Sequence, residues 1–209
     1  MEPSANERGV NMKLLKYNIR WKSIFGKGVK QLNDDFFVGM ICGSQGTGKN
    51  WFAVMLLLDN PKRKILTNIH SLKIPNREIF YFTKIEEVYK WNDQDSIFLI
   101  DECSKKWPKE SKQDRAFYSW LMQSRKHTRY VYMIFQEYIQ TPTWIRGVAN
   151  RVYTTNKFFF GRLCKTSLGV PVLNEETKEW ETDNYAYTIY KRNYYISTLY
   201  DTYERIEML

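Results

Sequence analysis

Short apolar runs alternate with longer amphipathic stretches between residues 36 and 156. Strands buried on both faces are expected where the runs are rich in β-branched, aromatic and aliphatic residues: Phe36–Cys42, Lys62–Ile69, Glu78–Phe82, Ser96–Ile100, Arg129–Phe135 and Arg151–Thr155. Helices are expected where apolar residues recur at a helical spacing: Lys49–Asp59, Lys84–Trp91, Ser111–His127 and Trp144–Ala149. Because strands and helices take turns along the chain, the sequence predicts an α/β fold with a mostly parallel sheet and helices on both faces.

A different pattern follows Asn156. Lys157–Leu163 and Tyr185–Tyr195 are aromatic, strand-like stretches, and the segment Leu168–Asp183 between them is rich in Gly, Pro, Asn and Glu. Two such stretches around a turn-rich segment predict a β-hairpin appended to the C-terminal end of the core.

The first 35 residues contain a polar start and then a basic lead-in with aromatic residues. Residues 1–11 have too little apolar content to pack, so disorder is expected there. The lead-in at 13–35 fits an arm that packs on a neighbour or touches DNA, or a short strand or helix that covers the sheet edge, and we favour the edge element. The predicted division is a partly disordered N-terminal arm at 1–35, a core at 36–156, and a hairpin and tail at 157–209 that complete the same domain.

The chain of 209 residues has a formal net charge of +9, from 32 basic and 23 acidic residues. This excess fits a polyanionic partner such as nucleic acid or a membrane surface, and it fits equally a basic protein without one. The cysteines have no paired spacing and the histidines are far apart, which argues against a disulfide framework or zinc site and fits a reducing cytoplasm. No apolar run has the length of a membrane-spanning helix, so none is expected.

A glycine-rich turn separates the first core strand from the first helix. Its residues are Gly43, Ser44, Gln45, Gly46, Thr47, Gly48 and Lys49. In this strand–turn–helix order, glycines let backbone N–H groups converge on phosphate oxygens, and the helix N-terminus favours the same anion. Lys49 adds a mobile positive charge. These residues predict a P-loop that binds a nucleoside triphosphate such as ATP.

Asn50 follows the P-loop lysine at a position that is normally Ser or Thr. The hydroxyl of that residue binds Mg²⁺ in P-loop proteins. An amide oxygen is also a hard ligand, although it reaches further and with a different geometry. Asn50 is therefore a candidate magnesium ligand whose effect on turnover the sequence leaves open.

Two acids and one amide end other strands of the core. Asp101 and Glu102 follow the apolar run Ser96–Ile100, and Gln136 follows Arg129–Phe135. Because the carboxyl ends of parallel strands lie at one rim of a sheet, these side chains should meet the P-loop. There Asp101 can hold Mg²⁺, Glu102 can orient and polarise an attacking water, and Gln136 can sense the γ-phosphate.

An arginine finger that stabilises charge on the transferring phosphoryl group often comes from an adjacent subunit. Arg125, Arg146 and Arg151 are candidates, and the sequence does not choose among them. We favour Arg125, which lies near the end of the predicted helix Ser111–His127.

Several motifs in fixed order resemble those of the zonula occludens toxin family, which includes the filamentous-phage gene I assembly proteins. These motifs are TNIH at Thr67–His70, IFLIDECSKKWP, WLMQSRKHT, VYMIFQ, IRGVANRVY and LYDT at Leu199–Thr202. The resemblance covers residues 36–202. That family is related to a wider group of DNA-pumping ATPases, which includes FtsK, HerA and the packaging ATPases of membrane-containing viruses.

The resemblance implies a ring-like homo-oligomeric ATPase that uses ATP and Mg²⁺ in virion assembly or DNA export. It implies viral genomic DNA and capsid or membrane-bound assembly proteins as partners, in the cytoplasm of the host cell, with recruitment to the virion or membrane. By position it assigns Lys49 to phosphate binding, Asp101 to Mg²⁺, Glu102 to water activation and Gln136 to sensing. The chain departs from the family at Asn50 and in lacking the transmembrane helix of the filamentous-phage proteins, which favours a motor that packages DNA into a preformed capsid.

Two other functions are weighed against this motor. In one, Asn50 has disabled turnover and the protein is a nucleotide-dependent assembly scaffold. In the other, it is a small-molecule P-loop kinase, which needs an arginine-rich lid. The segment Leu168–Asp183 is acidic and has no arginine, so it makes a poor lid.

Overall fold

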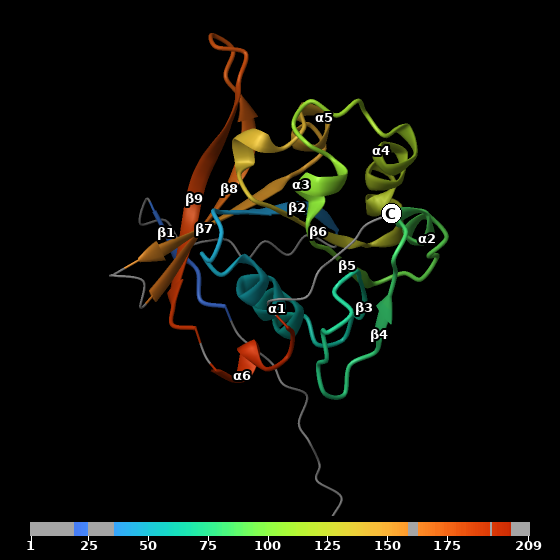
Figure 1. The fold of residues 1–209 in the computed structure, drawn as a ribbon. Coiled ribbons are helices and arrows are strands. Elements are labelled where there is room, and N and C mark those ends of the chain that lie inside the picture. The colour runs from blue at the N-terminus through green and yellow to red at the C-terminus, as the bar shows by residue number, and fades with distance from the viewer. Residues whose placement is uncertain (1–18, 25–35, 159–162, 193, 202–209) are drawn as a thin grey trace, which may run out of the picture.

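The structure is a computed structural model that describes residues 19–24, 36–158, 163–192 and 194–201. Its strands form a single sheet in the order β1-β9-β8-β7-β2-β6-β5-β3-β4 (Figure 1). In chain order the strands are β1 Lys22–Ser23, β2 Phe37–Cys42, β3 Lys64–Thr67, β4 Ile79–Tyr81, β5 Ser96–Ile100, β6 Tyr130–Phe135, β7 Arg151–Phe158, β8 Leu163–Leu173 and β9 Trp180–Tyr190. The helices are α1 Lys49–Asp59, α2 Ile85–Tyr89, α3 Cys103–Lys106, α4 Arg115–Met122, α5 Thr143–Arg146 and α6 Tyr194–Ser197, with 3-10 turns η1 Ser124–His127 and η2 Tyr138–Gln140.

The strands from β7 to β4 in this order run parallel, and β8, β9 and β1 continue the sheet antiparallel. β2 lies between β6 and β7, so the loop that follows β2 emerges at the centre of the parallel part. This arrangement confirms the predicted α/β fold with a mostly parallel sheet and an appended hairpin.

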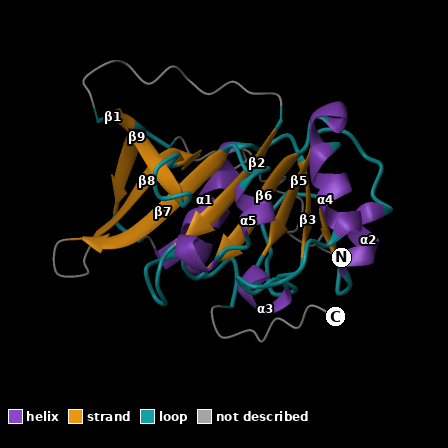
Figure 2. Cartoon of the chain, turned by 90° about the horizontal axis from the view of Figure 1, so that it is seen from above, coloured by secondary structure: helices purple, strands orange, loops and turns teal. Residues whose placement is uncertain are grey.

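Helices cover both faces of the sheet, as Figure 2 shows from above. On one face α1 is buried from Trp51 to Leu58 and packs with α6 against one apolar cluster. On the other face, residues of α2, α3, α4 and α5 contribute to a second cluster. Burial on both sides explains why β2 and β5 consist of apolar residues without polar alternation.

The appended hairpin has other boundaries than the sequence predicts. Leu168–Asp183 is not mainly a turn: β8 and β9 extend through much of it, and the connection covers only residues 174–179. Gly169 lies at a β-bulge, where an added Cβ would be 2.4 Å from the carbonyl oxygen of Asp183. Pro171 lies beyond the last β8 residue paired with β7, in a stretch paired on one side only, where a missing N–H is tolerated.

Two further elements differ from prediction in their limits. The helix predicted over 111–127 begins at Arg115, because the Asp114 side chain caps it by accepting a hydrogen bond from the Phe117 N–H at 3.1 Å. The lead-in contributes the edge strand β1, which pairs with β9, while residues 1–18 and 25–35 lie outside the described residues. None of the described helices has the length and apolar character needed to cross a membrane. The division of the chain at residues 35 and 156 stays a prediction.

Candidate active site

The P-loop conformation depends on its glycines. Gly46 and Gly48 have φ values of 75° and 95°, in the left-handed region that side chains with a Cβ rarely adopt. A Cβ on Gly43 would lie 2.4 Å from the carbonyl oxygen and 2.5 Å from the hydroxyl oxygen of Thr155 in β7. The loop therefore needs glycine twice for backbone conformation and once for the close approach of a neighbouring strand.

Hydrogen bonds hold the loop against both neighbours of β2. The Gly43 N–H donates to the Gln136 carbonyl oxygen at 3.1 Å, after β6. Thr47 is buried, and its hydroxyl donates to the Ser44 carbonyl oxygen at 2.8 Å and lies 3.1 Å from the hydroxyl of Thr155. Thr155 in turn donates to the Cys42 carbonyl oxygen at 3.1 Å. These contacts within the protein hold the loop in its conformation.

Lys49 begins α1, and its side chain turns back over the loop. The Nζ atom donates to the carbonyl oxygens of Gly43 at 2.6 Å and Ser44 at 3.1 Å. Burial lowers the pKa of Lys49, and the negative charge of Asp101 acts in the opposite direction. The ammonium group therefore lies inside the loop with only backbone carbonyls as acceptors, where phosphate oxygens would be stronger ones.

Asp101 follows β5 and is 5% exposed. Its backbone is held by Asn68, which accepts from the Asp101 N–H at 2.8 Å and donates to its carbonyl oxygen at 3.0 Å. The carboxylate accepts from the Glu102 N–H at 2.7 Å and from the Asn50 side-chain amide at 2.7 Å. Burial raises the pKa of Asp101 to about 6 despite these hydrogen bonds. The site thus holds a poorly solvated carboxylate next to the P-loop.

These residues fit a magnesium ion. Among the described residues, no three His, Cys, Asp or Glu side chains are grouped so that they could hold a metal. Mg²⁺ bound with nucleotide needs only one or two protein oxygens, with phosphate and water completing its coordination. The Asp101 carboxylate supplies one. Asn50 presents its N–H to Asp101, so its amide must turn over before its oxygen faces a metal bound there.

Glu102 has a backbone conformation unusual for its residue type. Its φ is 57° and its ψ is 32°, a left-handed conformation that costs about 1 to 2 kcal/mol outside glycine. It directly precedes α3, and its carboxylate lies 3.6 Å from the Lys105 ammonium. Local strain of this kind concentrates at functional sites because the surrounding structure maintains it.

One cavity of about 480 Å³ brings these groups together. Its lining includes the predicted residues Gln45, Gly46, Gly48, Lys49, Asn50, Asp101, Glu102 and Gln136. Ser104 also lines it, and its hydroxyl accepts a hydrogen bond from the Gln136 N–H at 3.2 Å, which links α3 to the end of β6. The predicted convergence of strand ends at one rim is therefore present.

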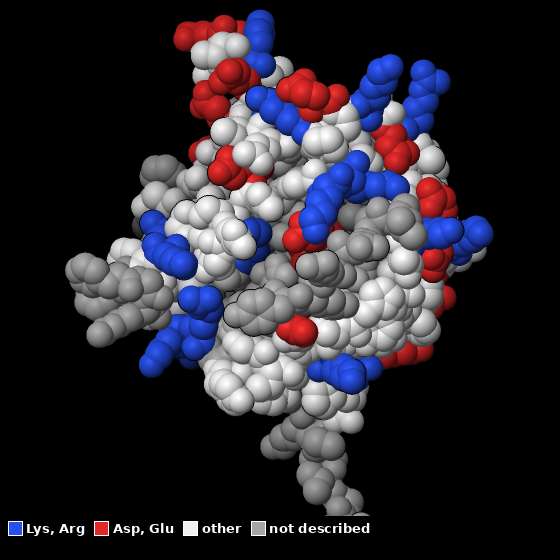
Figure 3. Space-filling model, in the orientation of Figure 1, with Lys and Arg blue, Asp and Glu red and all other residues white. Residues whose placement is uncertain are grey.

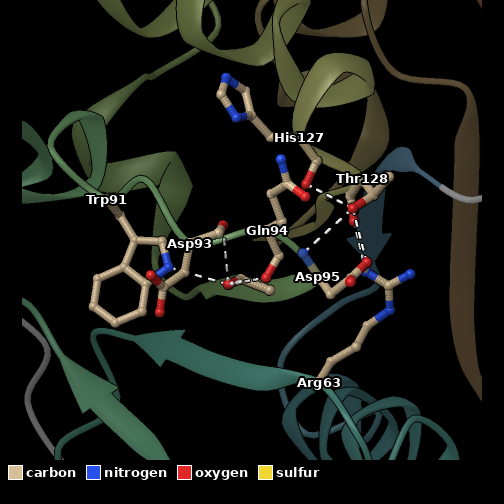
Figure 4. A network of polar contacts seen from close by, with 8 residues as sticks. Arg63, Trp91, Asp93, Gln94, Asp95, His127 and Thr128 are labelled. Carbon is tan, nitrogen blue, oxygen red and sulfur yellow. Dashed lines mark hydrogen bonds and ion pairs between the residues drawn. The ribbon is translucent and has the colours of Figure 1, made fainter.

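The backbone of Arg125 lies at the edge of the sheet opposite the cavity. It belongs to η1, just before β6 starts. Figure 4 shows the neighbouring His127 and Thr128 beside Asp95, which precedes β5. The Thr128 hydroxyl donates to the Asp95 carboxylate at 2.8 Å, so η1 is held at the amino ends of the strands.

The two alternative arginines are buried beside aromatic rings. Arg151 is 7% exposed and lies 4.1 Å from the centre of the Phe37 ring, and Arg146 is 6% exposed and lies 5.6 Å from that of Tyr138. Neither lines the cavity. Both arginines pack within their own subunit, which makes them poor candidates for a finger that reaches another one.

Some residues of the site have no signal in the sequence pattern. Asn68 holds Asp101, and only its place in the TNIH motif pointed to it. Thr155 and Ser104 are ordinary strand and helix residues until the fold brings them to the loop. Arg192 lines the cavity from the end of the hairpin, where a predicted strand gave no reason to single it out.

Comparison with known proteins agrees with the fold. No curated protein matches the chain at a significant level. The N-terminal domain of zonular occludens toxin from Neisseria meningitidis has a TM-score of 0.55 at 18% identity, covering 79% of this chain and 98% of that one. The genome packaging NTPase B204 from Sulfolobus turreted icosahedral virus 2, in complex with AMPPCP, has a TM-score of 0.50 at 9% identity, covering 71% of this chain and 97% of that one.

At such low identities the structural likeness concerns the fold alone. The family is shown by the sequence itself, because the family model described as Zonular occludens toxin (Zot) matches residues 37–192. This range contains the P-loop, the Asp101–Glu102 pair, Gln136 and the appended hairpin. The chain belongs to the zonular occludens toxin family.

Proposed function

We propose that this protein is an ATP-hydrolysing motor of virion assembly that translocates or packages viral DNA. The observation that carries the proposal is the single cavity in which Lys49, Asp101, Glu102 and Gln136 meet at the carboxyl ends of β2, β5 and β6. A phosphate-binding loop alone fits any nucleotide-binding protein. A second carboxylate beside the buried Asp101 adds a group for water activation, which hydrolysis requires.

The roles follow from the chemistry of each group. The P-loop N–H groups and Lys49 bind the β- and γ-phosphates, while Asp101 and a turned Asn50 amide hold Mg²⁺. The bound ion supplies positive charge to the phosphate oxygens. Glu102 orients the attacking water and takes up its proton, for which its carboxylate must leave Lys105. Gln136 senses the γ-phosphate from the adjacent strand end.

The proposal extends to a ring of identical subunits. The backbone of Arg125 lies at the amino edge of the sheet, away from the cavity of its own chain, so as a catalytic arginine it acts on a neighbouring subunit. The genome packaging NTPase that shares the fold supports viral DNA and capsid proteins as partners. Such a motor works in the cytoplasm of the host cell, recruited to the virion or membrane.

An exposed sheet face supports DNA as the polyanion. Cys164 and Leu168 are buried on the α1 face of β8, so alternation turns Lys165 to the opposite face, where it lies 5.1 Å from the centre of the Tyr187 ring. Phe158 is 45% exposed near it. No Asp or Glu occurs in β1, in β7, in residues 163–167 of β8 or in residues 185–190 of β9. Figure 3 shows acidic side chains towards the hairpin tip and Lys and Arg side chains lower down.

The test is phosphate release from Mg-ATP with and without single- and double-stranded DNA, alongside the particle mass with a nucleotide analogue. A motor releases phosphate faster with DNA and forms a defined oligomer with the analogue. Phosphate transfer to a nucleoside, or release that DNA does not change, contradicts the proposal. Because the motor must bind the DNA backbone, DNA affinity should fall steeply with added salt.

The Asn50–Asp101 hydrogen bond favours one second candidate, a nucleotide-dependent scaffold with little turnover. In it the Asn50 amide stays on the Asp101 carboxylate and competes with the metal for that oxygen. The scaffold binds ATP as the motor does, but its phosphate release equals that of a Lys49→Ala variant.

A further inference from the structure

The chain after β9 returns to the nucleotide cavity. We call the described residues 191, 192 and 194–201 the C-terminal strap. It starts beside Tyr190, whose ring stacks on Trp51 of α1 with centroids 4.9 Å apart. It ends where Leu199 accepts a hydrogen bond from the Lys73 N–H at 2.7 Å and the Asp201 N–H donates to Ser71 at 2.9 Å. Packing at both ends thus fixes the strap across α1.

Three side chains of the strap line the nucleotide cavity: Arg192, Ser197 and Tyr200. Arg192 is close to the P-loop, because its Cδ lies 3.7 Å from where a Cβ of Gly48 would be. Burial raises the pKa of Tyr200 to about 12; the charge of Arg192 acts against this rise and that of Asp101 adds to it, as expected if both groups lie near the phenol. A second cation besides Lys49 therefore stands at the cavity.

The strap and Glu102 lie towards opposite faces of the sheet. Residues of α6 pack with α1 in one apolar cluster, whereas Cys103, next to Glu102, packs in the cluster on the other face (Figure 1). The γ-phosphate must face Asp101 and Glu102, where the metal and the attacking water belong. The rest of the nucleotide then extends away from Glu102, towards α1 and the strap.

We propose that Arg192 is a phosphate-binding residue of the same subunit and contacts oxygens of the α- and β-phosphates. This inference rests on the proposed function, since it assumes a nucleotide in the cavity. An arginine offers planar, paired donors that match phosphate oxygens. The strap carries this charge next to Gly48, the residue before α1, and residues 193–201 lie beyond the part of the chain that the family model matches.

The test compares Arg192→Ala, Arg192→Lys and the control Lys191→Ala in equilibrium binding of ADP and ATP. Lys191 is adjacent, exposed and equally charged, but it does not line the cavity. Arg192→Ala should weaken ADP and ATP binding alike by about 10- to 100-fold, and Arg192→Lys by less. Lys191→Ala should keep wild-type affinity. Thermal unfolding without nucleotide should be unchanged in all three.

Other results overturn the inference in distinguishable ways. Loss of ATP affinity alone, with ADP unchanged, places Arg192 at the γ-phosphate. Equal losses in Arg192→Ala and Lys191→Ala indicate a general charge effect, and wild-type affinity in Arg192→Ala removes the residue from the site. If the wild-type protein binds neither nucleotide, the proposed function fails together with this inference. If Lys49→Ala abolishes nucleotide binding and Arg192→Ala does not change it, this inference fails and the proposed function stands.

Discussion

Replacing Asp101 with Asn should stabilise the protein in the absence of nucleotide while removing the proposed magnesium ligand. Burial raises the pKa of this carboxyl from 3.8 to about 6, so its ionised form costs about 3 kcal/mol of folding stability at pH 7. An Asn side chain of the same size avoids that cost. It loses part of the charge-assisted hydrogen bonds from the Glu102 N–H and the Asn50 amide, about 1 to 2 kcal/mol. The net gain of about 1 to 2 kcal/mol corresponds to a rise of about 2 to 8 °C in Tm.

The stability gained by Asp101→Asn over wild type should increase as the pH rises from about 4 to 7. Between about pH 4 and pH 6, native Asp101 holds a proton that the unfolded chain has released, so wild-type stability falls as the pH rises. The advantage of Asp101→Asn is therefore absent near pH 4 and complete at pH 7. Thermal or urea unfolding of both proteins across this range measures it. An Asp101→Asn protein that is less stable than wild type at pH 7, or a difference that does not change with pH, refutes the reasoning.

Three further substitutions test the loop, the metal ligand and the DNA face. Gly43→Ala puts a Cβ 2.4 Å from the Thr155 carbonyl oxygen and should lower the free energy of unfolding by about 2 to 4 kcal/mol, measured with urea. The control Gly147→Ala, whose Cβ would have its nearest atom at 3.6 Å, should keep wild-type stability. Equal losses in the two variants would contradict the close approach of Thr155. Asn50→Thr should lower the Mg²⁺ concentration for half-maximal hydrolysis, because a hydroxyl needs no amide rotation, and an unchanged magnesium titration argues against Asn50 as a ligand. Lys165→Ala should reduce the slope of log affinity for DNA against log salt by about 1; an unchanged slope removes this face from the DNA contact.

The sequence was sufficient where the physics is local or follows from alternation. Around Lys49, the glycines between a strand and a helix are themselves the sign of the backbone conformation that the loop needs. Because Asp101 and Glu102 follow a buried strand, a parallel sheet places them at the same rim as the P-loop. The hairpin limits were wrong because Gly169 and Pro171 are typical of turns. Their tolerance within β8 depends on a bulge and on an edge, both created by pairing with distant strands.

Long-range packing placed the residues that the pattern missed. Asn68 fixes the Asp101 backbone across 33 positions of sequence, and Thr155 reaches the P-loop across 108. Arg192 enters the cavity because aromatic stacking at Tyr190 and a backbone hydrogen bond at Leu199 hold the strap in place. No periodicity or spacing encodes such contacts, since they depend on which strands become neighbours.

ATP hydrolysis at this cavity is tested most directly by phosphate release from Mg-ATP, compared between the wild-type protein and Glu102→Gln. The ATP affinity of both proteins is measured alongside. Glu102 accounts for water activation but not for the binding of phosphate, so the variant should bind ATP as tightly as wild type and release phosphate at least ~100-fold more slowly. If the wild-type protein binds ATP but releases phosphate no faster than the variant, the protein is not the proposed motor and the scaffold function stands.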